Sequence, residues 1–349
     1  MINAVVVGHG LAGRYFQCPL IRRQPGLKLH GIVARDPAVR ADAVATWGQG
    51  VRGMARIDEA LGDPETDLVV IATPHSTHAD LAVQALEAGK HCVVDKVMAL
   101  TTADADRMIA AAHRADRMLS VFHNRRWDWD FLTLKQAIDR GQIGQPLLFE
   151  SAVCRHAPPR TWRGRAEEAG TILHDWGAHL VDQALQLGLG PCRRLSAWLV
   201  EAPWEGVTSG GHGRIVMEFD NALFQVETSR ICRLDRPRWW VMGSSGGYIQ
   251  YGVDPQEDAL RADNLDSAIQ LPEHRARVVT ESNQAAAERV LEPVRGSWDA
   301  FYANIAANLA GKAPLAVTAE QGREVVRVLE AAWLAAQQSR AVDGPWGGV

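Results

Sequence analysis

The chain has 349 residues, which is enough for two domains and a sizeable buried core. Hydrophobic residues make up 47% of it and charged residues 22%, a balance typical of a globular protein that folds in water. The formal net charge of -4 at pH 7 gives no overall basic character, so neither nucleic acid nor an anionic membrane is expected as a partner.

The cysteines and the apolar runs indicate the compartment. The five cysteines are odd in number, widely spaced and without a C-x-x-C pair, so the sequence predicts neither a disulfide framework nor a zinc site. No charged segment precedes the first apolar run, and no run reaches the roughly 18 residues that a membrane helix needs. We therefore expect a cytoplasmic protein without a membrane span.

A glycine-rich loop follows the first apolar run, residues 4–7, and has the pattern G-x-G-x-x-G. At the end of a strand, such glycines leave room for a pyrophosphate beside backbone N–H groups and a helix N-terminus. The next apolar stretch, 27–34, follows at the spacing of a βαβ unit. The pattern predicts a dinucleotide site, and the alternative is a glycine turn without a ligand. The expected cofactor residues here are Gly8, His9, Gly10, Leu11, Ala12 and Gly13.

Up to about residue 122, short β-branched runs alternate with helical stretches, which indicates a doubly wound parallel sheet. A helix is expected at 101–116, capped by Thr101 or Thr102, with apolar residues at helical spacing. The expected strands are 4–7, 29–34, 68–72, 91–94 and 119–122.

After Asn124 the pattern changes. One helix, 130–140, ends at Gly141, and Asp220-Asn221 between two alternating runs predicts a hairpin turn. Two helices close the chain. The expected extended segments are 147–153, 195–200, 214–219, 223–229, 238–242 and 247–251. We therefore expect a Rossmann dinucleotide-binding domain at 1–122. A second domain at 123–349 would be built on a large, mostly antiparallel open sheet for substrate binding and oligomerisation.

The end of the second strand bears on the choice of nicotinamide cofactor. An acidic side chain there, about twenty residues beyond the glycines, binds the ribose hydroxyls of NAD, whereas a small residue followed by Arg accommodates the 2′-phosphate of NADP. Ala34 stands at the expected acidic position and Arg35 follows it, so the sequence favours NADP. In the alternative, Asp36 is the ribose ligand and the cofactor is NAD.

Three segments could take part in chemistry. Lys96 follows the strand expected at 91–94, at the carboxyl edge of the parallel sheet where ligands bind, although it could also be an ordinary surface lysine. Residues 73–78 follow the strand at 68–72, where they could contact the cofactor. In the alternative, Ser76 or Thr77 caps the next helix.

The third segment is 174–182. If it is helical, Asp175, His179 and Asp182 share one stripe, and a His beside a carboxylate can accept the proton of an alcohol. The same spacing fits a buried structural His. A metal site that includes His174 is a further option, although we expect no metal.

Together these segments resemble the Gfo/Idh/MocA family, the relatives of glucose-fructose oxidoreductase and inositol dehydrogenase. The resemblance is carried, in chain order, by the loop at 8–13, Ala72-Thr73-Pro74 with His78, Ala88-Gly89-Lys90-His91, Asp95-Lys96 and residues 170–182. Residues 122–128 and 180–185 are similar to a subgroup that includes NADP-dependent scyllo-inositol dehydrogenases.

The resemblance implies a catalytic group of Lys96, Asp175 and His179. In it Lys96 holds the reacting oxygen, His179 transfers the proton, and Asp175 orients and tunes the pair. It also implies cofactor contacts at Thr73, Pro74, His78, Asp95, Lys96, Asn124, Trp162 and Arg163, and substrate contacts at Lys96, Arg126, Trp162, Asp175 and His179. One departure concerns the Glu-Lys-Pro usual in the family, which is Asp95-Lys96-Val97 here. The missing proline changes the backbone preference around Lys96.

We therefore expect an NAD(P)-dependent oxidoreductase, with NADP favoured, that acts on a secondary alcohol of a sugar, cyclitol or derivative. A homodimer or homotetramer is implied by the resemblance. Two alternatives stay open: a lyase or glycosidase that retains its nicotinamide and acts by transient oxidation, and a non-catalytic NADP-sensing regulatory protein.

Overall fold

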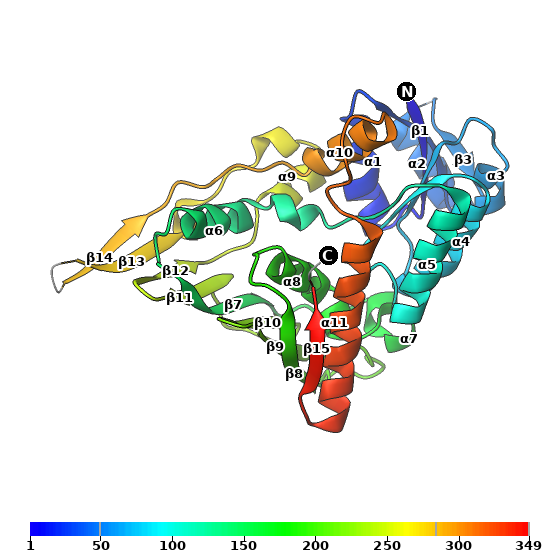
Figure 1. Ribbon diagram of the computed structural model, residues 1–349. Coiled ribbons are helices and arrows are strands. Elements are labelled where there is room, and N and C mark those ends of the chain that lie inside the picture. Colours follow the sequence, from blue (N-terminus) through cyan, green and yellow to red (C-terminus); the bar gives the residue numbers. More distant parts are fainter. Residues whose placement is uncertain (49, 283–284, 348–349) are drawn as a thin grey trace. The chain divides into compact units, whose positions relative to one another are not determined.

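The computed structural model describes residues 1–48, 50–282 and 285–347 (Figure 1). The chain forms two compact units. The first unit contains residues 1–124, 257–267 and 298–323, and the second contains 125–256, 268–297 and the described residues after 323. The domain division at 122/123 stays a prediction, and the sequence pattern did not indicate the two later segments of the first unit.

The first unit contains a six-stranded parallel sheet in the order β3-β2-β1-β4-β5-β6. Since the order runs outward from β1 in both directions, right-handed crossovers place the helices of the two halves on opposite faces. The expected doubly wound sheet is confirmed. The strands are β1 (Ile2–Val7), β2 (Leu27–Val33), β3 (Arg52–Met54), β4 (Leu68–Ile71), β5 (His91–Val94) and β6 (Leu119–Val121).

The sequence pattern did not predict β3, because this strand has three residues and two of them are exposed. The helix expected at 101–116 is present as Thr102–Ala115, and the hydroxyl of Thr101 accepts from the N–H of Asp104. The helices of the first unit are α1 (Cys18–Arg22, preceded by a π-helical turn at Gly13–Gln17), α2 (Pro37–Trp47), α3 (Ile57–Leu61), α4 (His78–Glu87), α5 (Thr102–Ala115), α9 (Gln256–Arg261) and α10 (Asp299–Leu309).

The second unit contains a nine-stranded sheet in the order β14-β13-β12-β11-β7-β10-β9-β8-β15. Among the described strands of this sheet, only β7 and β10 pair in parallel, so the mostly antiparallel sheet is confirmed. The strands are β7 (Pro146–Cys154), β8 (Cys192–Val200), β9 (His212–Glu218), β10 (Leu223–Ser229), β11 (Trp239–Gly243), β12 (Gly246–Gln250), β13 (Arg277–Ser282), β14 (Ala285–Val290) and β15 (Val342–Trp346).

Asp220-Asn221 turns the chain between β9 and β10 as predicted, and the Phe219 N–H donates to the carbonyl of Ala222 at 2.9 Å. The outer strands β13, β14 and β15 were not predicted because they lack a clear alternation of apolar and polar residues. Helix α8 (Trp176–Leu185) packs on β7 and β10 (Figure 1). The other helices that contribute to this unit are α6 (Trp129–Asp139), α7 (Ala166–Ala169) and α11 (Ala319–Gln338).

No helix in the described ranges combines the length and the apolar character required to cross a lipid bilayer.

The glycine loop after β1 is held by close backbone approaches. Gly8 has a φ of +98°, and a Cβ there would lie 2.5 Å from the carbonyl oxygen of Ala72. A Cβ at Gly13 would lie 2.0 Å from the carbonyl oxygen of Gly8, whereas a Cβ at Gly10 would have no heavy atom within 4 Å. Gly8 and Gly13 are therefore required by packing, and Gly10 leaves open space beside the backbone.

A buried histidine shapes the turn that leads into α8. His174 is 5% exposed, and its Nδ1 accepts from the N–H of Thr171 at 3.1 Å. Gly170, with a φ of +73°, leaves room for the ring, because a Cβ there would lie 2.6 Å from it. Burial lowers the pKa of His174 to about 4. The ring is therefore neutral at pH 7.

We expect Gly13→Ala to lower the free energy of unfolding by about 1–3 kcal/mol, because the new Cβ forces the loop backbone apart. Gly10→Ala is the matched control, with an expected change below about 0.5 kcal/mol. Urea denaturation at pH 7 measures both. Equal losses in the two variants would contradict the packing argument.

We expect stability to fall as pH drops from about 6.5 to about 4, since the unfolded chain takes up a proton at His174 that the folded chain excludes. The full contribution is roughly 3 kcal/mol. His174→Gln should reduce the slope of unfolding free energy against pH in this window, measured by urea denaturation. The control is His113→Gln, because the His113 side chain is 74% accessible. An unchanged slope in His174→Gln would refute the assignment.

Candidate active site

The predicted cofactor residues of the first unit follow the carboxyl ends of four neighbouring strands. The glycine loop follows β1, Ala34-Arg35 follows β2, Thr73-Pro74 follows β4, and Asp95-Lys96 follows β5. Parallel strands end at a common edge, and the strand order changes direction beside β1. In open α/β sheets this is where ligands bind.

His9, inside the glycine loop, has a buried ring with one nitrogen accounted for. Its Nε2 accepts from the indole N–H of Trp47 at 2.9 Å, so Nδ1 carries the proton of the neutral ring. Burial, followed by the nearby Arg14, lowers the pKa of His9. Nδ1 is buried and has no hydrogen-bond partner within the described residues. The loop therefore holds a donor that could meet an acceptor oxygen of a bound ligand.

At the end of β2, the carboxylate of Asp36 is used by the protein itself. It caps α2 by accepting from the N–H of Ala38 at 2.8 Å. Arg40 Nη1 donates to the carbonyl oxygens of Ala34 and Arg35, both at 2.7 Å, which fixes this turn. The Arg35 side chain is exposed and forms no ion pair with any part of the chain that the structure describes. It is available to an anionic ligand.

His78 connects the loop after β4 with the segment after β5. It is fully buried, with Nδ1 2.8 Å from the carbonyl oxygen of Val97 and Nε2 3.0 Å from that of Thr73. Burial lowers its pKa. The Lys96–Val97 peptide bond is cis. The predicted helix cap at Ser76 or Thr77 is wrong, because the Thr77 hydroxyl donates to the carbonyl of Pro74 at 2.7 Å and no side chain caps α4.

In the second unit, the expected single helical stripe of Asp175, His179 and Asp182 is corrected. Asp175 lies before α8 as its N-cap residue, with a φ of -82° and a ψ of -98°, because the chain turns there. His179 lies on the first turn, 6% exposed, with its ring centroid 6.0 Å from that of Trp176. Asp182 binds the guanidinium of Arg126 through two hydrogen bonds of 2.9 and 2.6 Å. That pair anchors α8.

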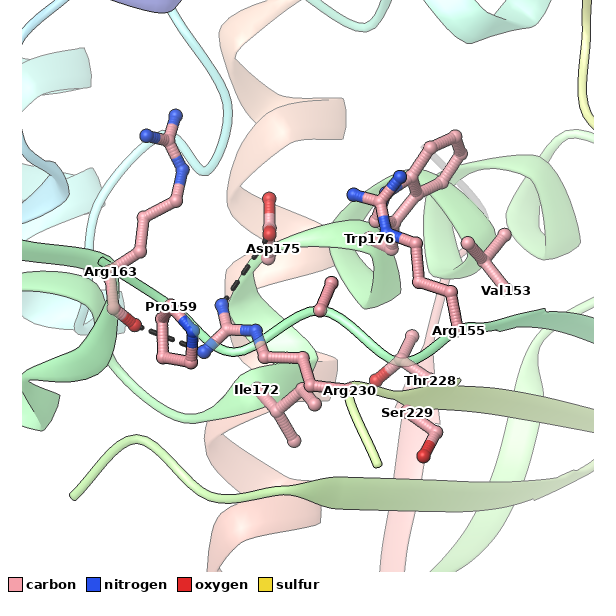
Figure 2. A pocket seen from close by; sticks show the side chains of 11 residues that line it. Val153, Arg155, Pro159, Arg163, Ile172, Asp175, Trp176, Thr228, Ser229 and Arg230 are labelled. Atoms are coloured by element: carbon pink, nitrogen blue, oxygen red, sulfur yellow. Dashed lines mark hydrogen bonds and ion pairs between the residues drawn. The ribbon is translucent and has the colours of Figure 1, made fainter. Parts of the chain in front are cut away.

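A cavity of about 110 Å³ lies where β7 and β10 end beside α8 (Figure 2). Asp175 and Trp176 line it from the start of α8, and three arginines line it from the strand ends and the following loop. These are Arg155, Arg163 and Arg230. Arg230 Nη2 lies 3.5 Å from Asp175 Oδ2. Burial, and then repulsion from Arg163 and Arg155, lower the pKa of Arg230, opposed by Asp175.

Arg163 and Asp175 were expected from the sequence, whereas Arg155 and Arg230 were not. These two follow β7 and β10, which pair in parallel with Ser229 opposite Cys154. Their only sequence signal is that Arg230 directly follows the strand expected at 223–229 and that Arg155 lies two residues beyond the strand expected at 147–153. Trp162 packs under the guanidinium of Arg163, with the guanidinium carbon 4.6 Å from the ring centroid. Asn124 is 4% exposed at the end of the first segment of unit 1.

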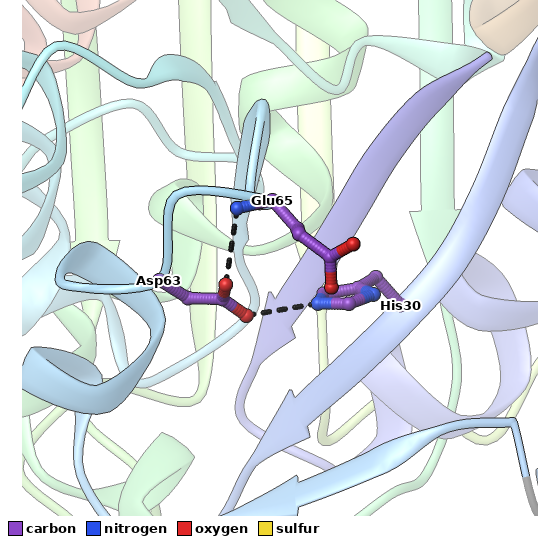
Figure 3. Close-up of side chains that lie close together, drawn as sticks. All are labelled: His30, Asp63 and Glu65. Atoms are coloured by element: carbon purple, nitrogen blue, oxygen red, sulfur yellow. Dashed lines mark hydrogen bonds and ion pairs between the residues drawn. The ribbon is translucent and has the colours of Figure 1, made fainter.

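Two groups of described residues have ligand atoms close enough to hold a metal ion: His30, Asp63 and Glu65 (Figure 3), and Asp128, Asp130 and Asp254. In the first, Asp63 lies 2.9 Å from His30 Nε2 and pairs with Arg52. In the second, guanidinium groups pair with Asp128 and Asp130 at 3.2 and 2.9 Å. Arginines thus provide positive charge in both groups. His174, Asp175, His179 and Asp182 form no such group within the described residues.

Comparisons with known proteins agree along the chain. The family described as "Oxidoreductase family, NAD-binding Rossmann fold" matches residues 2–123, and the GFO/IDH/MocA C-terminal domain matches 131–249. The uncharacterized oxidoreductase YdgJ of Escherichia coli strain K12 is 34% identical over 94% of each chain.

The scyllo-inositol 2-dehydrogenase (NADP(+)) IolW of Bacillus subtilis is 29% identical over 98% of this chain and 95% of its own. Among solved structures, Bacillus subtilis yvaA has a TM-score of 0.91 at 28% identity, with 98% of each chain covered. Yersinia pestis YPO2259 has a TM-score of 0.88 at 34% identity, over 98% of this chain and 97% of its own. The chain therefore belongs to the Gfo/Idh/MocA family of NAD(P)-binding oxidoreductases.

Proposed function

We propose that the protein is an NADP-dependent oxidoreductase that moves a hydride between nicotinamide C4 and a secondary alcohol carbon of a sugar, cyclitol or derivative. The observation that carries this proposal is the glycine loop at the change of strand order. There Gly10 leaves the backbone open and His9 Nδ1 offers a buried donor with no partner in the described chain. Both features fit a pyrophosphate. The NADP-specific name of IolW supports the choice of cofactor.

We propose NADP rather than NAD on the local chemistry after β2. Asp36 already caps α2, which opposes its use as a ribose ligand, and Arg35 is exposed beside it. A guanidinium can bind a 2′-phosphate through two parallel hydrogen bonds. The other proposed cofactor contacts are Thr73, Pro74, His78, Asp95, Lys96, Asn124, Trp162 and Arg163.

Side chains of the protein would bind the reacting oxygen of the substrate and transfer its hydroxyl proton. When bound, the nicotinamide supplies hydride acceptance and donation at C4. The Lys96 ammonium would donate a hydrogen bond to the reacting oxygen. His179 would take the hydroxyl proton during oxidation and return it during reduction. Asp175 is the proposed orienting and tuning group.

We also propose a cytoplasmic location and a homo-oligomeric assembly. The five cysteines are free thiols, which fits the cytoplasm. A homodimer or homotetramer is supported by apolar side chains on one face of the second unit's sheet. Trp198, Val200 and Leu223 are 55%, 49% and 43% exposed there, on strands whose pairing puts them on the same side.

We expect Lys96→Met and His179→Gln each to lower kcat by roughly 10²- to 10⁴-fold, because each removes a group acting on the reacting oxygen or its proton. The NADPH affinity of the His179→Gln variant should stay within about threefold, measured by the fluorescence of bound NADPH. The control is Lys312→Met at an exposed position. Turnover is measured at 340 nm with a panel of polyols and ketoses. Unchanged turnover in either variant would refute its role.

We expect Arg35→Ala to weaken NADPH binding roughly 10- to 100-fold and NADH binding little, because only NADPH carries the 2′-phosphate. Fluorescence titration with the two cofactors measures the ratio. Lys28→Ala is the control, since Lys28 is an exposed cation at the other end of β2. Equal weakening for both cofactors would assign Arg35 a role other than phosphate recognition.

A further inference from the structure

The cavity beside α8 carries an excess of positive charge. Its lining residues include Arg155, Arg163 and Arg230, against one acidic residue, Asp175. Arg230 is the arginine that pairs with Asp175. Arg155 and Arg163 form no ion pair with the described residues. Two of the three lining arginines therefore have no counter-charge among the described residues.

Nearby arginines differ from these two. Arg165 pairs with Glu168, Arg214 pairs with Glu227, and Arg236 pairs with both Glu150 and Glu227. These three arginines lie beside acids, whereas Arg155 and Arg163, like the exposed Arg160 outside the lining, form no ion pair with the described residues.

The backbone that carries the arginines is fixed by hydrogen bonds. Arg230 has a side chain that is 10% accessible, and its Nη1 donates to Ser209 Oγ at 3.0 Å and to the Arg163 carbonyl at 3.1 Å. Ser209 Oγ also donates to that carbonyl, at 2.9 Å. The Arg155 N–H donates to the Ser229 carbonyl at 3.0 Å. These hydrogen bonds therefore fix the segments from which the three arginine side chains extend.

Figure 2 shows the arrangement, with Asp175 between the side chains of Arg163 and Arg155 and the guanidinium of Arg230 next to it. A cavity of about 110 Å³ is somewhat smaller than the roughly 150 Å³ that holds a benzene ring. It can accept one end of a polyol but not a dinucleotide. A guanidinium fork matches the geometry of carboxylate and phosphate oxygens.

We propose that the substrate is an anionic polyol, a sugar acid or a sugar or cyclitol phosphate, whose acidic group binds between Arg155 and Arg163 beside Asp175. This rests on the proposed function and narrows its substrate class. Arg155 is the specificity-determining residue, and Arg163, which is also a proposed cofactor contact, adds positive charge beside it. The alcohol that is oxidised lies on the same molecule.

The test uses matched pairs of neutral and anionic compounds with the purified full chain and saturating NADP⁺ or NADPH. Glucose is compared with glucuronate and with glucose 6-phosphate, sorbitol with gluconate, and myo-inositol with inositol monophosphate. We expect at least one anionic compound to exceed its neutral partner tenfold or more in kcat/KM. The preferred pair shows whether the acidic group is a carboxylate or a phosphate.

Arg155→Gln should lower the anionic-to-neutral ratio of kcat/KM by roughly 10- to 100-fold, the loss expected for a charged hydrogen bond. Arg155→Lys should restore part of it, because it keeps the charge without the fork. Arg160→Gln is the control, an exposed arginine outside the cavity lining, and should leave the ratio unchanged. The proposal is overturned if neutral compounds match or exceed their anionic partners. It is also overturned if Arg155→Gln weakens NADPH binding instead of changing the ratio.

Failure of the proposed function can be distinguished from failure of the anion site. If the chain binds no nicotinamide or turns over no compound, titration calorimetry with the same pairs of compounds tests the anion site directly. Anion binding that Arg155→Gln weakens at least tenfold and Arg160→Gln does not would support the anion site by itself. Absent or equal binding of neutral and anionic partners would overturn it.

Discussion

The first unit depends on the close contact of two backbone segments at the end of β1. Gly13 passes so near the carbonyl of Gly8 that a Cβ would lie 2.0 Å from it, and Gly8 in turn lies against Ala72 after β4. This contact holds the start of the helical segment against the carboxyl ends of β1 and β4. Because Gly8 and Gly13 have no side chains, the loop can make this contact and still leave open space at Gly10.

The second unit depends on buried arginine pairs rather than on glycines. Arg126 with Asp182 anchors α8, and Arg238 with Asp130 lies in the interior with both side chains at most 2% accessible. Breaking such a pair leaves a buried charge without a counter-charge, so these arginines and carboxylates constrain one another. With α8 fixed in this way, Asp175 and His179 stand at its first turn in a defined position relative to β7 and β10.

The arginines of the cavity play a different part, since their charges are not all balanced within the described chain. Such a site favours ligands that bring their own negative charge, because binding then replaces repulsion between guanidinium groups by attraction. The chemistry proposed for Lys96 and His179 and the anion recognition proposed for Arg155 and Arg163 are separate requirements. Lys96 and His179 act on the hydroxyl group that reacts. The arginines determine which substrate binds.

The parallel βαβ alternation, the glycine loop, the cap at Thr101 and the β9–β10 hairpin could be predicted from the sequence, because each is encoded by residues close together in the chain. Only the tertiary structure decided that β7 and β10 pair in parallel, which brings Arg155 and Arg230 together from 75 positions apart. It also decided that Asp182 belongs to Arg126 and that Asp36 caps a helix. Periodicity reports which residues face a core, but the partner of a charged side chain depends on the packing of distant segments, which the local pattern does not contain.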